Sequence, residues 1–207
     1  MERYVLQTDV DEFETYFGVK PASSEIIKPN YNASSGHALP VVWGDKTRSV
    51  ELAKWNTNRP TVNITEHTFG QIFGKALQPC IIPVTGFYMW KKTVNDPLPF
   101  FVRIHSRKLL ATAGVIDTVK SRYSFQVLTR EASVLLKPLD EEMPCILEPS
   151  EIDSWLNGNE QKVLAKGFSH NLFMPDMTVF RVPDLVNDIS NNSPDLIQPI
   201  PKLRDDD

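Results

Sequence analysis

Few residues of the types that carry catalysis lie at spacings that would bring them together. The four histidines are far apart, at positions 37, 67, 105 and 170, whereas a metal site needs several converging ligands and usually a close-spaced pair. Glu141 and Glu142 are adjacent, and neighbours in sequence rarely act on one substrate atom, so we interpret them as an exposed acidic turn. We expect no metal site and no cofactor.

Nucleophile and nucleotide motifs are also missing. The sequence contains no P-loop, no dinucleotide-binding glycine pattern and no serine-hydrolase elbow. Cys80 and Cys145 each lie in an apolar run without paired spacing, which predicts buried, reduced thiols. The segment from Pro79 to Trp90 is the most unusual, because Gly86 is followed by a dense run of aromatic residues. By composition alone it could be plain core.

The elements that would position these residues follow from the apolar pattern. Asp9 precedes an amphipathic run with Phe13, Tyr16 and Phe17 on one face, which predicts a helix. Residues 20–37 are polar and turn-rich and predict a loop, followed by a short strand at 41–43. A second helix is expected to begin near Thr65.

The middle of the chain predicts strands, at 80–84, 87–90, 98–104, 109–116 and 123–128. Within 98–104, alternation predicts a sheet buried more deeply on one side. Helices are expected at 131–137 and after Ser150, which could cap a helix ending at Gly158. Strands in the middle with helices before and after indicate an α+β fold.

Composition limits the class of protein. The 207 residues are 41% apolar, enough for one domain with a real core. No apolar run approaches the roughly 20 residues of a membrane helix and the N-terminus lacks signal-peptide features, so we expect a cytoplasmic protein. The net charge of −4 argues against broad electrostatic attachment to nucleic acid, so any such binding must be local.

Many short segments, in order, resemble one family. The sequence resembles the SRAP family, the abasic-site-processing proteins that bind single-stranded DNA and crosslink to abasic sites. The matching residues are Arg3 and Tyr4, Tyr31 to Ala33 with Gly36, Pro40 to Gly44, Asn63, Cys80 to Trp90, Pro99 to Phe101, Ala113 and Gly114, Leu128 to Ala132, Met143 and Pro144 with Ile146 and Leu147, Val186 and Asn187, and Leu196 to Pro199. The resemblance implies a single SRAP-like domain over residues 1–200, with a mostly antiparallel, strongly curved or barrel-like sheet flanked by helices. An acidic tail would follow at 201–207.

The family's chemistry, as the resemblance implies it, needs a cysteine at the mature N-terminus, whose amine and thiolate close a thiazolidine on the abasic aldehyde. An asparagine, a glutamate and a histidine support this reaction and a related self-cleavage. Asn32 is the member of this set that we can place, whereas Glu2, Met89 and Asp140 occupy the positions of the cysteine, the glutamate and the histidine. Removal of Met1 is disfavoured before glutamate, so the amine is expected to be that of methionine. We therefore expect thiazolidine crosslinking and self-cleavage to be lost, with a reversible Schiff base from Met1 left open.

Binding could survive this loss. The resemblance implies a groove that binds single-stranded or abasic DNA in a DNA-damage response, weakly and with an affinity that falls with salt. Bases would stack on aromatic rings and cations would hold phosphates. The candidate residues are Arg3, Trp43, Lys46, Arg48, Trp55, Arg59, Trp90, Lys91 and Lys92. Two alternatives stay open: a non-enzymatic scaffold that uses the cleft for a protein or small-molecule partner, and a divergent hydrolase with Glu2 or Asp140 as base.

Overall fold

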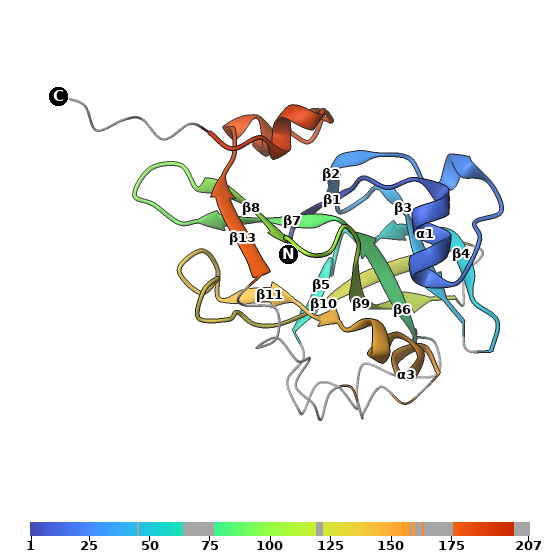
Figure 1. Ribbon diagram of the computed structural model, residues 1–207. Helices are drawn as coiled ribbons and strands as arrows, with labels where there is room; N and C mark the ends of the chain where they lie inside the picture. The colour runs from blue at the N-terminus through green and yellow to red at the C-terminus, as the bar shows by residue number, and fades with distance from the viewer. Residues whose placement is uncertain are drawn as a thin grey trace.

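A computed structural model describes residues 1–44, 46–63, 77–118, 122–157, 159, 163 and 176–200. Within these ranges the strands form two sheets (Figure 1). The antiparallel first sheet has the order β13 (Met177–Arg181), β8 (Leu98–Ile104), β7 (Gly86–Lys91), β1 (Arg3–Leu6) and β2 (Asn30–Ser34). The predicted helix near Thr65 and the predicted acidic tail at 201–207 lie outside these residues.

The second sheet curls on itself. Its order is β11 (Glu142–Pro144), β10 (Ser124–Glu131), β4 (Ser49–Trp55), β3 (Ala38–Trp43), β6 (Leu77–Val84), β9 (Leu110–Asp117) and β12 (Ile146–Leu147), and β5 (Thr61–Asn63) pairs with β10. Because β10 pairs with both β4 and β9, the strands β10, β4, β3, β6 and β9 close a ring. The predicted α+β class with a curved, barrel-like sheet is therefore confirmed.

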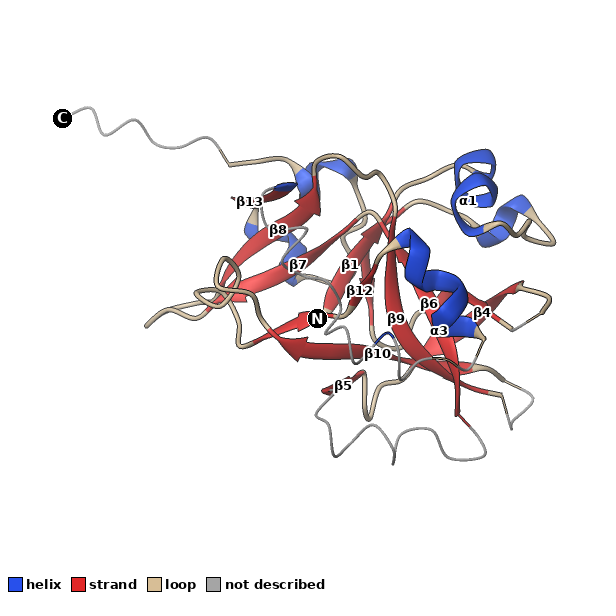
Figure 2. Cartoon of the chain, turned by 60° about the horizontal axis from the view of Figure 1, so that its bottom comes forward, coloured by secondary structure: helices blue, strands red, loops and turns tan. Residues whose placement is uncertain are grey.

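Two helices pack beside the ring (Figure 2). Helix α1 (Val10–Phe17) begins as predicted, since the Asp9 carboxylate accepts the Glu12 N–H at 2.8 Å, and Gly18 ends it in the left-handed conformation. Helix α3 (Ile152–Leu156) follows a 3₁₀ turn at Pro149–Glu151. The prediction that Ser150 caps this helix is wrong, because the turn begins earlier, where the Glu148 N–H donates to the Glu151 carboxylate. The predicted stop at Gly158 lies outside the described residues.

Two other expectations fail because tertiary pairing overrides local propensity. The predicted loop at 20–37 contains β2, whose Ser34 and Ala33 pair with Arg3 and Tyr4. The predicted helix at 131–137 is absent from this part of the chain: Glu131 ends β10 by pairing with Glu142, and residues 134–139 form turns that lead back to β11.

The core has two parts that meet at the first sheet. The larger fills the ring, where Trp55 is fully buried and stacks on Phe125 at 5.8 Å. The smaller lies between the first sheet and the C-terminal segment, residues 182–197, and consists of Val5, Tyr31, Tyr88, Phe101, Val182, Val186 and Leu196. β8 is buried more deeply on one side, as its alternation predicted, because Val102 and Ile104 are buried in the larger core whereas Arg103 is exposed. Phe101 lies on the other side of the strand and packs in the smaller core. In the described chain no helix is long and apolar enough to cross a bilayer.

Candidate functional site

A cleft of about 480 Å³ opens where β1 begins. Parts of the chain that are distant in sequence meet here: the start of β1, the end of β7, the β7–β8 hairpin, the turn before β11 and the C-terminal segment. Its lining residues are Glu2, Arg3, Trp90, Lys92, Asp96, Pro97, Asp140, Asp184 and Asn187. The structure thus brings together Glu2, Arg3, Trp90, Lys92 and Asp140 from the set predicted by sequence.

Asn32, on β2, fastens the C-terminal segment to the sheet. Its Nδ2 donates to the carbonyl oxygens of Val186, Asp188 and Asn191 at 3.0–3.1 Å, and its Oδ1 accepts from Arg3 at 3.0 Å. The side chain is 1% exposed. Its amide is therefore fully used in anchoring, and its predicted part in chemistry stays a prediction.

Arg3 and Trp90 are fixed by the same segment. The Arg3 guanidinium donates to the carbonyl oxygens of Val186 at 2.7 Å and Asn187 at 3.3 Å, and lies 5.9 Å from the centroid of the Trp90 ring. The Trp90 Nε1–H donates to Asn187 Oδ1 at 2.8 Å. The wall formed by Arg3 and Trp90 is consequently preorganised, but the hydrogen-bonding edge of Arg3 is already engaged.

The α-amine of Met1 lies among carboxylates. Met1 is 7% exposed, and burial lowers the pKa of its amine, opposed by the negative charges of Asp140, Glu142 and Glu2. Glu142 is itself held by Thr129, whose hydroxyl donates to it at 2.7 Å. A lowered pKa increases the fraction of neutral amine, the form that can act as a nucleophile. Asp140, where the sequence resemblance places a histidine, is thus close enough to act on this amine electrostatically.

Met89, where the sequence resemblance places a glutamate, and the two cysteines carry no reactive group toward the cleft. Met89 is 2% exposed and packs in the larger core, where β7 pairs it with Phe100. Cys80 and Cys145 are fully buried free cysteines, as predicted, and burial raises the pKa of both thiols. Neither sulfur can therefore replace an N-terminal thiol at the surface.

The remaining predicted DNA contacts lie elsewhere. Trp43 and Lys46 line a second cleft of about 580 Å³ beside the end of α3, and Arg48 is ion-paired with Asp153 and donates to the Phe17 carbonyl. Trp55 is buried in the core, with its Nε1–H on the Pro60 carbonyl at 2.7 Å, so its ring offers no face to a base. The structure does not gather these residues into one groove.

Arg59 and Lys91 are placed mainly by their backbones. The Arg59 carbonyl accepts from Gln126 at 2.7 Å, and Lys91 is an exposed residue that ends β7. Lys91 follows Trp90 directly, and successive strand residues point to opposite faces. Lys91 is not among the residues that line the cleft, whereas Lys92 is.

Sequence reasoning missed two of the carboxylates that line the cleft, those of Asp96 and Asp184. Four carboxylates, those of Glu2, Asp96, Asp140 and Asp184, face two cationic side chains, those of Arg3 and Lys92. Asp96 and Asp184 each lie beside a proline, a pattern typical of turns that carries no sign that both residues border one cleft. Among the described residues, no group of three side chains is arranged to hold a metal ion.

This chain is similar in sequence to known proteins over most of its length. The family model for SOS response associated peptidase (SRAP) matches residues 2–189. The chain belongs to the SRAP family. This SRAP protein is similar to abasic site processing protein YoqW of Bacillus subtilis, with 26% identity over 224 aligned positions that cover 95% of this chain and 98% of YoqW. It is also similar to abasic site processing protein YMR114C of Saccharomyces cerevisiae, with 23% identity covering 87% of this chain and 55% of that protein.

Solved structures show the same fold. A protein from Bacteroides thetaiotaomicron superposes with a TM-score of 0.74 at 16% identity, covering 97% of this chain and 100% of the other. A protein from Bordetella bronchiseptica gives a TM-score of 0.68 at 16% identity, covering 88% and 100%. The fold of this chain is therefore shared with these proteins, although Glu2, Met89 and Asp140 stand at positions where the sequence resemblance places catalytic groups.

Proposed function

We propose that this SRAP protein binds single-stranded DNA and abasic sites, in a DNA-damage response, at the cleft where β1 begins, without forming a thiazolidine crosslink. The observation that carries the proposal is the meeting of Glu2, Arg3 and Asp140 beside Trp90 in one cleft. The buried Met1 amine lies close enough to this cleft to feel the charges of Asp140 and Glu2. Relatives over nearly the whole chain are named abasic site processing proteins. The partly exposed Trp90 suits a stacked base, and Lys92 supplies a cation for a phosphate.

The residues at the cleft limit the chemistry to reversible steps. A thiazolidine needs an amine and a thiolate on one residue, and Glu2 carries a carboxylate instead. The neutral Met1 amine can add to the aldehyde of an opened abasic sugar, and loss of water then gives an imine. Water reverses this step, because no thiolate is present to trap the imine carbon.

A crosslinking gel tests the chemistry. We expect incubation with abasic single-stranded DNA to give no denaturation-resistant band, and borohydride to give one by delivering hydride to the imine carbon and leaving a secondary amine. An oligonucleotide without the abasic site is the control. A heat-stable band formed without reductant would overturn the proposed loss of crosslinking.

Fluorescence anisotropy tests the binding. We expect K92E to weaken binding of a labelled abasic oligonucleotide and to lower the magnitude of the slope of log K against log salt by about one, as loss of one phosphate contact does. K54E, the same charge change on exposed Lys54 of β4, should leave both quantities unchanged. Absence of any anisotropy change at low salt would contradict the proposed DNA binding.

A second candidate function rests on the excess of carboxylates in the same cleft. These side chains favour a cationic partner over a phosphate backbone, which would make the protein a scaffold that uses the cleft for another protein or small molecule. Fluorescence anisotropy also distinguishes these two functions. A labelled oligo-lysine peptide that binds more tightly than DNA, and loses affinity in D96K but not in K54E, would favour the scaffold.

A further inference from the structure

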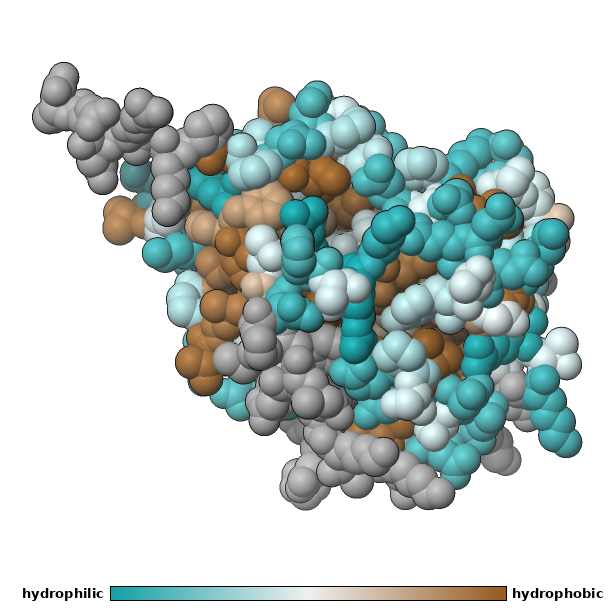
Figure 3. Space-filling view, in the orientation of Figure 1, coloured by the Kyte–Doolittle hydropathy of each residue, from teal (hydrophilic) through white to brown (hydrophobic). Residues whose placement is uncertain are grey.

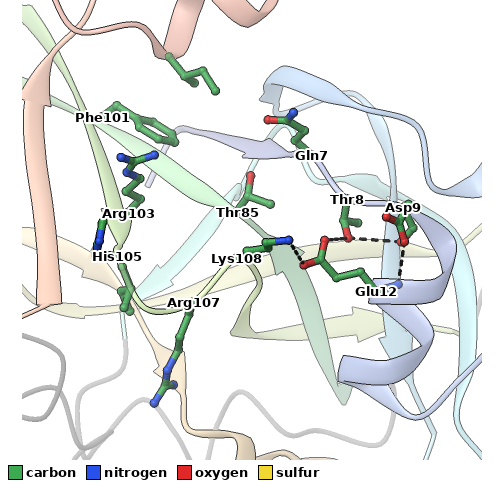
Figure 4. Close-up of a pocket in the computed structure, with 12 residues that line it drawn as sticks. Gln7, Thr8, Asp9, Glu12, Thr85, Phe101, Arg103, His105, Arg107 and Lys108 are labelled. Atoms are coloured by element: carbon green, nitrogen blue, oxygen red, sulfur yellow. Dashed lines mark hydrogen bonds and ion pairs between the residues drawn. The ribbon is translucent and has the colours of Figure 1, made fainter.

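A third hollow, a polar groove of about 590 Å³, lies at the other end of β1. One wall is formed by Gln7, Thr8 and the first turn of α1, and the other by the end of β8 and the turn that follows it (Figure 4). Thr85, Phe101 and Ile197 complete the lining. The groove shares no lining residue with the cleft at the start of β1.

Most charges around this groove are paired with one another. Glu12 accepts from the Thr8 hydroxyl at 2.9 Å and is ion-paired with Lys108 at 3.5 Å. Asp9 is occupied in capping α1. Arg107 turns away from these groups in Figure 4 and is ion-paired with Glu148 at 2.6 Å.

Three hydrogen-bond donors are left without an acceptor. Within the part of the chain that the structure describes, no hydrogen bond or ion pair engages the side chains of Gln7, Arg103 or His105. Arg103 lies on β8 and His105 begins the turn that follows this strand, and both line the groove. The Arg103 guanidinium lies 5.8 Å from the centroid of the Phe180 ring, a contact that orients the group and leaves its N–H edges free. Figure 4 shows Arg103 and Gln7 on opposite sides of the groove.

We propose that this groove binds a phosphate group, held by Arg103 with His105 and Gln7. A guanidinium matches the oxygens of a phosphate, and an amide and an imidazole supply donors from other directions. The two carboxylates that line the groove do not oppose this, since Glu12 is neutralised by Lys108 and Asp9 lies at the positive end of α1. The proposal is independent of DNA binding at the start of β1. The phosphate can belong to a nucleic-acid backbone or to a free phosphate compound.

Nuclear magnetic resonance of the ¹⁵N-labelled full chain tests the groove. Inorganic phosphate, a nucleoside 5′-monophosphate and a single-stranded oligonucleotide are titrated separately at constant ionic strength, with chloride as the control anion. We expect saturable shifts of the amide signals of Gln7 and of residues 103–108. R103E and R103Q should weaken the affinity about 10- to 100-fold, the effect of removing a charge-assisted hydrogen bond, and K54E should not change it.

The outcomes separate the sources of the phosphate and the two proposals. Shifts with phosphate or the monophosphate identify a free compound, and shifts with the oligonucleotide alone identify a nucleic-acid backbone; both support the groove. No saturable shift with any probe, or shifts that R103E and R103Q leave unchanged, would overturn it. Sensitivity of DNA binding to K92E is read separately, so either proposal can fail alone.

Discussion

Asn32 shows how one side chain can join three parts of the molecule. It is buried on β2, accepts from Arg3 on β1 and donates to three carbonyl oxygens of the C-terminal segment. Removing its amide leaves the Asn191 carbonyl without this donor and takes one of two donors from the carbonyls of Val186 and Asp188. The cost of such unsatisfied buried groups is about 1–3 kcal/mol.

We therefore expect N32A to lower the free energy of unfolding by about 2–3 kcal/mol, and to reduce hydrogen-exchange protection in residues 184–192. N58A is the matched control, because the exposed Asn58 side chain makes no such contacts. Urea denaturation measures the first effect and hydrogen exchange the second. Wild-type protection of residues 184–192 in N32A would contradict the anchoring role.

For single residues, the sequence predicted the positions that depart from the family pattern better than it predicted which residues surround them. Motif order alone placed Glu2 and Asp140, which the cleft does bring together, and marked Met89, which lies in the core. It could not place Trp55, because a tryptophan has the same pattern in a core as on a binding surface. Nor could it pair Asp96 with Asp184, since their proximity depends on how β7, β8 and the C-terminal segment are arranged.

At the scale of elements, α1 is the case in which local rules were sufficient. Asp9, the apolar face of Phe13 and Phe17, and Gly18 are all local signals, and each does in the structure what its type predicts. By contrast, β2 and the turns at 134–139 are determined by partners far along the chain, to which local propensity is blind. The central strands were recognisable because β-branched and aromatic residues are dense there.

The cap of α1 gives a prediction at this scale. We expect D9A to destabilise the protein by about 1 kcal/mol, because the Glu12 N–H loses its acceptor. D11A is the control, since Asp11 lies exposed in the same first turn and does not accept that hydrogen bond. Thermal unfolding of both variants measures the difference. Equal losses in D9A and D11A would show that charge near the helix end, not capping, is responsible.

For the molecule as a whole, the fold class and family were within reach of the sequence, whereas the arrangement of the two cores was not. The ring explains why so many strands are apolar, and the smaller core explains why Phe101 is buried on the second face of β8. The polar, proline-punctuated stretch after Pro183 gave no indication that it covers the first sheet (Figure 1). On the face drawn in Figure 3, hydrophilic residues alternate with apolar patches.

The hydrogen bonds from Arg3 and Asn32 to the C-terminal segment have a consequence for biosynthesis. Arg3 and Asn32 leave the ribosome long before Val186, Asp188 and Asn191, the residues whose carbonyl oxygens they bind. Until those residues emerge, the nascent chain exposes Val5, Tyr88 and Phe101 as an aggregation-prone apolar surface. Such long sequence separation slows folding, so this apolar face stays open to aggregation from the synthesis of Phe101 until that of Leu196.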